Sequence, residues 1–399
     1  MQGWPRSRKG ASPPAFGLPP GFFKSEKKMT ALENEADVAA AVADASGPQV
    51  VRGGGTRRVG RPVAGDVLDV SGLSGITLYE PGALTIVALA GTPLADIEAA
   101  LTGENQRLAF EPYDLTSMLG TSGASTIGGV MATNASGPRR IQAGAARDFA
   151  LGVRFVDGRG NVVKNGGRVM KNVTGYDLVK LMNGSWGTLG VLTEVSLKVL
   201  PAVEATATLV IPALDPARAV AAMSAALGSP YDVTGAAWIS GAVRLRIEGF
   251  ASSVEYRATA LGDLLRAYGD VNRDDTADWA EVRDATPLHS HKLVWRISVK
   301  PSDGPAIVAA LPAGSDAMMD WGGGLIWAGC NDAQADAHAQ VQSAVAALGG
   351  HATLIKAPET LRAAVPVFQP QAPGVAALST ALRARFDPRG ILNPGLMAV

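Results

Sequence analysis

Three glycine-rich segments between residues 53 and 190 constrain the fold of this 399-residue chain more than any other feature. The first is Gly53-Gly54-Gly55, which directly follows a short strand-like segment at residues 49–51. The second, residues 123–137, mixes glycines with short hydroxyl and amide side chains, and the third covers residues 184–190. Because glycine has no Cβ, backbone N–H groups in such segments can approach an anionic ligand closely. The clustering therefore indicates a ligand that is held largely by backbone.

Two familiar phosphate-binding motifs do not fit the first segment. The glycines are not followed by Lys-Ser or Lys-Thr, which excludes the nucleotide P-loop. No helix is expected directly after them and the G-x-G-x-x-G spacing is missing, which excludes the Rossmann fingerprint. Taken alone, the glycine triplet fits a flexible turn equally well. The second segment favours ligand binding over a flexible turn, since its hydroxyl and amide groups suit a pyrophosphate and a ribityl chain without adding net charge.

Charge and cysteine content exclude several classes of protein. Lys+Arg and Asp+Glu both number 36, so the chain has no basic excess for binding nucleic acid or an anionic membrane surface. The single cysteine, Cys330, excludes an internal disulfide and a self-contained iron–sulfur cluster, and it fits a reducing, cytoplasmic location. The most apolar stretch, residues 83–101, is interrupted by glycine, proline and charged residues, so we expect no membrane span.

Local signals predict the elements of the N-terminal half. The first 28 residues are rich in proline without periodicity, and we expect them to be disordered, with Met29 as the natural start. A capping box at residues 30–33 predicts a helix that runs to residue 45. Strands at 151–156 and 161–163 flank a hairpin turn, whereas residues 121–140 are expected to form a loop.

The character of the chain changes after Pro201, where strands and helices alternate. Strands are expected at residues 205–211, 236–250, 293–299, 325–328 and 352–355, and helices at 217–227, 253–268, 305–311 and 332–348. This pattern predicts an α+β domain over a largely antiparallel sheet.

Four motifs in order make the sequence resemble the PCMH-type flavin-binding domain of the vanillyl-alcohol-oxidase superfamily. They are residues 51–57, 126–137, 173–178 and 184–195. The ending Phe386-Asp-Pro-Arg-Gly-Ile-Leu-Asn393-Pro-Gly395 is similar to the C-terminal signature of the lactate/glycolate branch. Within that branch, residues 133–140, 169–177 and 293–299 resemble the family of smaller FAD-binding subunits of bacterial glycolate oxidases (glycolate dehydrogenases).

The resemblance implies a two-domain α+β fold that binds FAD. Some relatives link flavin covalently through histidine, sometimes with cysteine, but all four histidines of this chain follow residue 288, outside the FAD loops, so we predict non-covalent FAD. The resemblance divides the chain into an N-terminal extension (1–28), a PCMH-type FAD-binding domain (29–203), an α+β cap domain (204–365) and a C-terminal segment (366–399) that returns to the FAD domain. The residues implied to wrap the pyrophosphate are Arg52, Gly53, Gly54, Gly55, Thr56 and Arg57. Those implied to continue toward the flavin ring are Thr126, Gly128, Gly129, Thr133, Asn134 and Ser136. Gly190 and Val191 would lie near the adenosine half, and Asn393 near the flavin.

Residues for substrate oxidation are harder to find. Oxidation of a 2-hydroxy acid needs a base, a cation for the carboxylate and a hydride acceptor. Active members of the branch carry Gly-His and Gly-Asp-Gly-Asn-x-His segments, whereas this chain has no histidine in residues 320–327, and Trp186 replaces a usual glutamate. His289 and His291 would share one side of a strand, but a metal site needs at least one further ligand. We therefore predict no metal site, leave the catalytic residues unassigned, and expect the four tryptophans at 186, 295, 321 and 327 to be core or interface residues.

The resemblance also implies partners. In this family the smaller FAD-binding chain works beside a larger flavoprotein subunit and an iron–sulfur subunit in a membrane-associated complex that oxidises glycolate, and in some cases D-lactate. We expect this chain to hold FAD and to relay electrons rather than to carry the substrate base. Two alternatives stay open: a self-sufficient FAD-dependent D-2-hydroxy-acid dehydrogenase, and a flavin-free assembly subunit that retains the fold.

Overall fold

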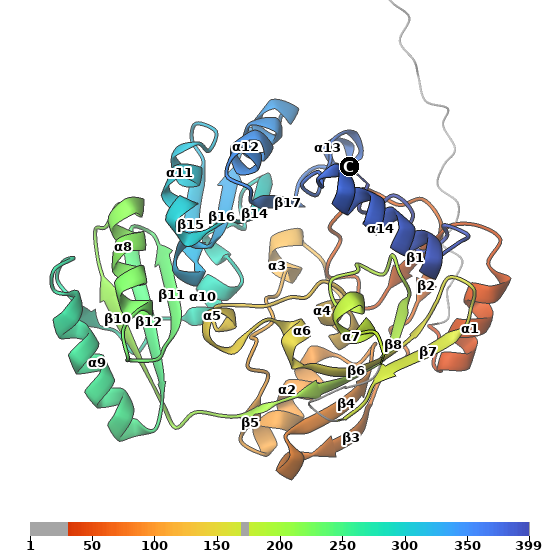
Figure 1. Cartoon of the computed structure of the whole chain (residues 1–399), viewed down its shortest axis with the longest axis horizontal. Coiled ribbons are helices and arrows are strands. Elements are labelled where there is room, and N and C mark those ends of the chain that lie inside the picture. The colour runs from red at the N-terminus through yellow and green to blue at the C-terminus, as the bar shows by residue number, and fades with distance from the viewer. Residues whose placement is uncertain (1–30, 169–174, 399) are drawn as a thin grey trace, which may run out of the picture. The chain divides into compact units, whose positions relative to one another are not determined.

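The structure is a computed structural model that describes residues 31–168 and 175–398 (Figure 1). Residues 1–28, for which we expect disorder, and Met29, the expected natural start, lie outside the described residues. Residues 169–174, which belong to two of the family motifs, also lie outside them. In the described part of the chain, no helix is both long and apolar enough to cross a membrane.

A pair of parallel strands leads into the first glycine segment. Strand β1 (Gln49–Arg52) pairs with β2 (Asp66–Asp69), and the glycine triplet follows β1 directly. Helix α1 (Glu35–Asp44) precedes this pair. Its N-cap is Asn34, whose side chain accepts a hydrogen bond from the backbone N–H of Asp37. The expectation of a helix that starts at a capping box in residues 30–33 is therefore wrong, because the asparagine caps the helix one turn later.

A five-stranded antiparallel sheet lies at the centre of the N-terminal half. Its strand order is β3 (Ile76–Glu80), β4 (Thr85–Leu89), β8 (Val191–Lys198), β6 (Ala150–Val156) and β7 (Val162–Gly166). The expected hairpin between β6 and β7 is confirmed. In its turn the Asp157 carboxylate accepts hydrogen bonds from the backbone N–H groups of Arg159 and Asn161, at 2.8 and 2.9 Å.

The N-terminal half also contains short helices. They are α2 (Leu94–Gly103), α3 (Thr116–Leu119), α4 (Ile127–Ala132), α5 (Arg140–Ala143), α6 (Ala146–Phe149) and α7 (Leu178–Met182), and a small strand pair joins β5 (Gln106–Arg107) to β9 (Leu200–Pro201). Helix α4 lies in the region that we expect to be a loop, so that expectation is wrong. Thr126 caps α4, and Gly128 lies so close to Ala90 that its N–H donates to the Ala90 carbonyl oxygen at 2.7 Å. Tertiary contacts therefore supply the stability that two glycines remove from the helix.

The C-terminal half contains an eight-stranded sheet in which every pairing is antiparallel, as predicted. Its order is β13 (Asn272–Arg273), β10 (Ala205–Ile211), β12 (Ala242–Gly249), β11 (Val233–Ile239), β15 (Asp316–Asp320), β16 (Leu325–Cys330), β14 (Leu293–Ser298) and β17 (His351–Lys356). The sequence pattern misses β15, because its buried Met318 and Met319 lie between two aspartates that resemble a turn.

The helices that pack against strands of this sheet include α5, which lies against β11, together with α8 (Pro216–Leu227), α9 (Ala251–Leu265), α11 (Gly304–Ala309) and α12 (Ala335–Ala347) (Figure 1). Trp295 on β14 contacts α12, because its Nε1–H donates to His338 Nδ1 at 3.0 Å. Since successive side chains of a strand point to opposite faces, Arg296 points away from α12. Shorter helical segments are α10 (Trp279–Arg283) and the 3₁₀ turns η1 (Pro81–Ala83), η2 (Thr286–Leu288), η3 (Pro301–Asp303) and η4 (Trp321–Gly323).

The tail returns to the first strand pair. After α13 (Glu359–Ala364) and α14 (Pro373–Phe386), the chain runs beside β1, with a parallel bridge between Gln49 and Leu392. The Gln49 N–H donates to the carbonyl oxygen of Ile391 at 2.7 Å, and the Asn393 N–H donates to that of Gln49 at 2.9 Å. The tail thus reaches the glycine triplet from the side opposite β2.

Candidate functional site

The glycine triplet lies against the loop that precedes α4. A Cβ at Gly53 would come within 2.7 Å of Thr126 Oγ1, and a Cβ at Gly54 would collide with the carbonyl oxygen of Ala124. Gly55 has a φ of +69°, a left-handed conformation that residues with side chains adopt only at a cost. Glycine is therefore needed here for close approach at two positions and for backbone conformation at the third.

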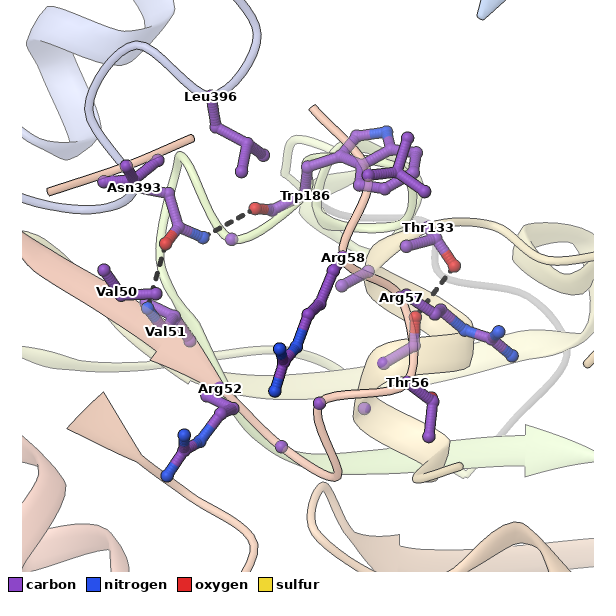
Figure 2. Close-up of a pocket in the computed structure, with 18 of the residues that line it drawn as sticks. Val50, Val51, Arg52, Thr56, Arg57, Arg58, Thr133, Trp186, Asn393 and Leu396 are labelled. Carbon is purple, nitrogen blue, oxygen red and sulfur yellow. Dashed lines mark hydrogen bonds between the residues drawn. The ribbon is translucent and has the colours of Figure 1, made fainter. Parts of the chain in front are cut away.

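Asn393 connects the tail to β1 and to the third glycine segment (Figure 2). Its Oδ1 accepts a hydrogen bond from the Val51 N–H at 2.9 Å, and its Nδ2 donates to the carbonyl oxygen of Trp186 at 2.9 Å. A Cβ at Gly187 would lie 2.8 Å from this Nδ2, so a glycine next to Trp186 leaves room for the asparagine. Three segments that are distant in sequence therefore meet around one side-chain amide.

A cavity of about 470 Å³ opens where these segments meet, within the size range of cofactor sites. The predicted site residues that line it are Arg52, Gly53, Gly54, Gly55, Thr56, Arg57, Thr126, Gly128, Gly129, Thr133, Gly190 and Asn393. A second cavity of about 420 Å³ shares the glycine triplet with the first and adds the hydroxyl groups of Ser71, Ser74, Thr121 and Ser122. The glycine triplet thus lies between two hollows, one rich in arginine and one rich in hydroxyl groups.

Three predicted site residues do not line either cavity. Asn134 Oδ1 accepts a hydrogen bond from the Arg147 N–H at 2.9 Å, and Ser136 Oγ accepts one from the Ala146 N–H at 2.9 Å. Both side chains therefore hold the start of α6 in place. Val191 is fully buried in the small core between α1, β2 and the tail.

Charged residues are unevenly distributed around the larger cavity. It is lined by five arginines and one glutamate: Arg52, Arg57, Arg58, Arg61, Arg362 and Glu359. Sequence reasoning missed Arg58, Arg61 and the two residues of α13. The α13 pair could not be found from local spacing, because 302 positions separate Arg362 from Gly60, to whose carbonyl oxygen its Nη1 donates at 3.0 Å. The positive excess suits an anionic ligand such as a pyrophosphate.

Arg57 has free hydrogen-bonding capacity. Its Nη2 donates to the carbonyl oxygen of Tyr113 at 3.0 Å and to Ser125 Oγ at 3.2 Å, whereas its Nε and Nη1 are buried without a partner among the described residues. Loss of hydration lowers the pKa of Arg57. Figure 2 shows the Arg57 side chain leaving the turn on the opposite side from those of Arg52 and Arg58. Arg52 is paired with Asp69 at 2.9 Å. Buried N–H groups without a partner are costly unless a ligand meets them.

These features fit the FAD that the family resemblance implies. The glycine triplet leaves its backbone uncovered by side chains, Arg57 offers unused donors, and the neighbouring cavity supplies hydroxyl groups for a sugar and phosphates. No histidine or cysteine is among the described residues that line the two cavities, so neither of them offers a side chain for the covalent links found in some relatives.

The two closely spaced histidines have separate roles. They do not share one side of a strand as expected, because they follow η2 and precede β14. His289 Nε2 contacts the carbonyl oxygen of Asp284 at 2.9 Å, and the buried His291 contacts Asp316 Oδ2 at 2.9 Å. Within residues 31–168 and 175–398, no group of three or more histidine, cysteine, aspartate or glutamate side chains is arranged to hold a metal ion.

A buried ion network joins the segment before α5 to the eight-stranded sheet. Its members are Arg107, Glu111, Arg139, Arg246 and Glu248. Arg246 lies 2.9 Å from each oxygen of the Glu111 carboxylate through its two terminal nitrogens, and Arg139 forms hydrogen bonds to both oxygens of Glu248. Each charge of this network is therefore met by an opposite one, which a buried ion network requires.

Comparison with known proteins identifies the family of this chain. Residues 29–166 match a family model described as an FAD binding domain. The chain is 36% identical over 362 residues to glycolate oxidase subunit GlcE of Escherichia coli (strain K12), a match that covers 88% of this chain and 92% of that protein.

Other relatives match over less than half of the chain. The chain is 35% identical over 165 residues to glycolate oxidase subunit GlcD of Bacillus subtilis (strain 168), which covers 41% of this chain and 34% of that protein. It is 34% identical over 168 residues to D-lactate dehydrogenase of Anaerostipes hadrus, with 41% and 34% covered. A solved alkyldihydroxyacetonephosphate synthase has a similar fold, with a TM-score of 0.66 at 19% identity over 90% of this chain and 73% of that one.

Proposed function

Because this chain belongs to the family of the glycolate oxidase subunit GlcE, we propose that it is the FAD-binding subunit of a complex that oxidises glycolate, with D-lactate as a second substrate, to the 2-oxo acid. One observation carries this proposal: three glycine segments, the returning tail and five arginines meet around a single cavity within or beside the FAD binding domain. Bound flavin supplies the redox chemistry of such a complex.

We propose specific roles for the residues around the cavity. The backbone of Gly53 to Gly55 and the unused donors of Arg57 bind the pyrophosphate, since they combine close approach with positive charge. Thr126 and Thr133 line the path toward the flavin ring, and Asn393 fixes the tail there. The domain division that we propose is 29–203 for FAD binding, 204–365 for the cap and 366–399 for the returning segment.

Partners follow from the same family. The relatives include both a GlcE and a GlcD subunit, which supports an assembly of several subunits. We propose a larger flavoprotein subunit and an iron–sulfur subunit as partners, because the single cysteine of this chain cannot supply a cluster of its own. In this assembly the chain relays electrons, since residues 320–327 lack histidine and Trp186 occupies the position of the usual glutamate.

The test is an absorption spectrum of the full chain purified alone, before and after acid release of the cofactor, followed by addition of glycolate without air. The expected result is releasable FAD that stays oxidised until the partner subunits are added. Bleaching by glycolate in the isolated chain would contradict the relay role and would favour a self-sufficient dehydrogenase. Colourless protein that does not take up FAD would overturn the proposal and favour an assembly subunit.

A further inference from the structure

Several arginines in or near the cavity have no carboxylate oxygen within 4 Å among the described residues. Three of them, Arg57, Arg140 and Arg296, are also connected to one another through aromatic rings. The contrast with the paired network of Arg139 and Arg246 is sharp, because those side chains lie in the same region and are fully matched by glutamates. Unmatched cations at partly buried positions are costly, so they call for a bound anion.

Aromatic rings connect these arginines. The Cζ atoms of Arg57 and Arg296 lie 5.4 and 5.7 Å from the centre of the same Tyr113 ring. The Trp321 ring is shared in the same way, with Arg296 at 4.9 Å and Arg140 at 4.4 Å. Tyr113 therefore links the cavity-lining Arg57 to Arg296, and Trp321 links Arg296 to Arg140.

The Arg296 side chain donates no hydrogen bond to any described residue, and its Nε is buried without a partner among them. Trp327 adds a third ring, 5.8 Å from its Cζ. The buried Asp320 carboxyl is close enough to favour the charged form of Arg296, but it makes no ion pair with it. Because Trp295 on the same strand points to α12, Arg296 points to the opposite face of the sheet, where Tyr113 lies. Loss of hydration lowers the pKa of both Arg296 and Arg140, as expected for cations that await a counter-ion.

We propose that Arg296 and Arg140, which both lie against the Trp321 ring, bind the carboxylate of a small 2-hydroxy or 2-oxo acid. This inference rests on the proposed function, and it gives this subunit a substrate-binding role in addition to its flavin. A guanidinium offers a planar fork of N–H donors that matches a carboxylate. The link through Tyr113 to Arg57 places the bound acid beside the cavity proposed for FAD.

The test uses the full chain loaded with FAD and kept without air. Glycolate is titrated and followed by tryptophan fluorescence and calorimetry, while the visible spectrum records FAD content and reduction. The uncharged amide glycolamide and inorganic phosphate are titrated in parallel. We expect saturable binding of glycolate and none of glycolamide. Equal binding of the amide would overturn the proposal, and tighter binding of phosphate would assign the site to a phosphate group instead.

Two substitutions separate binding from folding. Arg296→Met is expected to weaken glycolate binding by about 10- to 100-fold, the range for loss of charge-assisted hydrogen bonds. Its melting temperature should not fall, because the change removes an unpaired buried cation. Arg296→Lys should bind with intermediate affinity, since it keeps the charge without the fork. Arg266→Gln, which removes an exposed arginine on α9, is the control and should leave the affinity unchanged.

The outcomes also separate this inference from the proposed function. A wild-type chain that carries FAD but binds no glycolate would overturn the proposed carboxylate site and leave the proposed function standing. A chain that carries no FAD would overturn the proposed function instead. If Arg296→Met lost both glycolate affinity and thermal stability, the arginine would be a structural residue and the inference would be wrong.

Discussion

Asn393 and Trp186 are joined by a hydrogen bond of 2.9 Å from the asparagine Nδ2 to the tryptophan carbonyl oxygen, across 207 positions of sequence. The same side chain accepts a hydrogen bond from Val51 through its Oδ1. Both Asn393 and Trp186 have positive φ, at 44° and 55°, so two residues in uncommon backbone conformations support each other. The amide thus acts as a clasp between the tail, β1 and the third glycine segment.

Asn393→Asp should open this clasp with little change in volume. The aspartate can still accept from the Val51 N–H, but its second oxygen would face the Trp186 carbonyl oxygen, where no hydrogen bond is possible. We expect the free energy of unfolding to fall by about 1–3 kcal/mol and FAD to dissociate faster. Urea denaturation and flavin release measure the two effects. Asn272→Asp, on the exposed strand β13, is the matched control, and a similar loss there would argue against a specific clasp.

Gly53→Ala should lower the FAD content of the purified chain. The new Cβ would lie 2.7 Å from Thr126 Oγ1, so Thr126, which caps α4, would have to move. Gly47→Ala is the matched control, because no atom lies within 4 Å of a Cβ at that position. The ratio of flavin to protein absorbance compares the two variants. Equal FAD content in both would show that the glycine turn is not part of the binding site.

The Glu248 carboxylate should make the free energy of unfolding depend on pH in the acid range. Burial favours its neutral form, but Arg246 and Arg139 outweigh burial and lower the pKa of Glu248 from 4.5 to about 2. The folded chain therefore binds fewer protons than the unfolded chain, and the stabilisation is present above pH 4.5 and is lost as the pH falls toward about 2.

Glu248→Gln tests this account. The free energy of unfolding of the variant should be about 3–5 kcal/mol lower at neutral pH, because Arg139 and Arg246 each lose a buried counter-charge. Its stability should also depend less on pH between 4.5 and 2 than that of the wild type. Chemical denaturation at several pH values measures both effects, and identical acid profiles would exclude Glu248 as the titrating group.

His338 should add a second acid-sensitive step nearer to neutrality. Its Nδ1 accepts from Trp295, so the ring is neutral and its Nε2–H donates to the Pro366 carbonyl oxygen at 2.8 Å. Burial lowers the pKa of His338 below 6.5, so the stabilisation by the neutral ring is complete above pH 6.5 and declines as the pH falls. His338→Phe should cost about 1–3 kcal/mol and should remove this slope. A slope that persists in the variant would have to come from another group.

Most of the fold follows from local patterns. Strand β10 (Ala205–Ile211) has the predicted bounds, because alternating apolar residues are bounded by turn signals. Helix α4 could not be predicted, since Gly128 and Gly129 disfavour a helix and only contact with Ala90 and the Thr126 cap stabilise it. The start of α1 was misplaced because Asn34 competes with the residues before it as a cap.

The sequence predicts the part of the cavity that residues adjacent in sequence line together. The glycine triplet and its flanking arginines form this part, and the family resemblance adds Asn393. The α13 side of the cavity was not predictable, because Arg362 reaches Gly60 only through the folded chain. The same holds for Arg296, whose importance lies in the acidic partner that it lacks rather than in any sequence motif.

The return of the tail to β1 has a consequence for biosynthesis. Strand β1 leaves the ribosome more than 300 residues before Asn393. Until Asn393 is synthesised, the Val51 N–H and the Trp186 carbonyl oxygen lack the hydrogen bonds of its side chain. A chain whose synthesis has not reached Asn393 therefore lacks one wall of the cavity. We expect such a chain to bind FAD less tightly than the full chain.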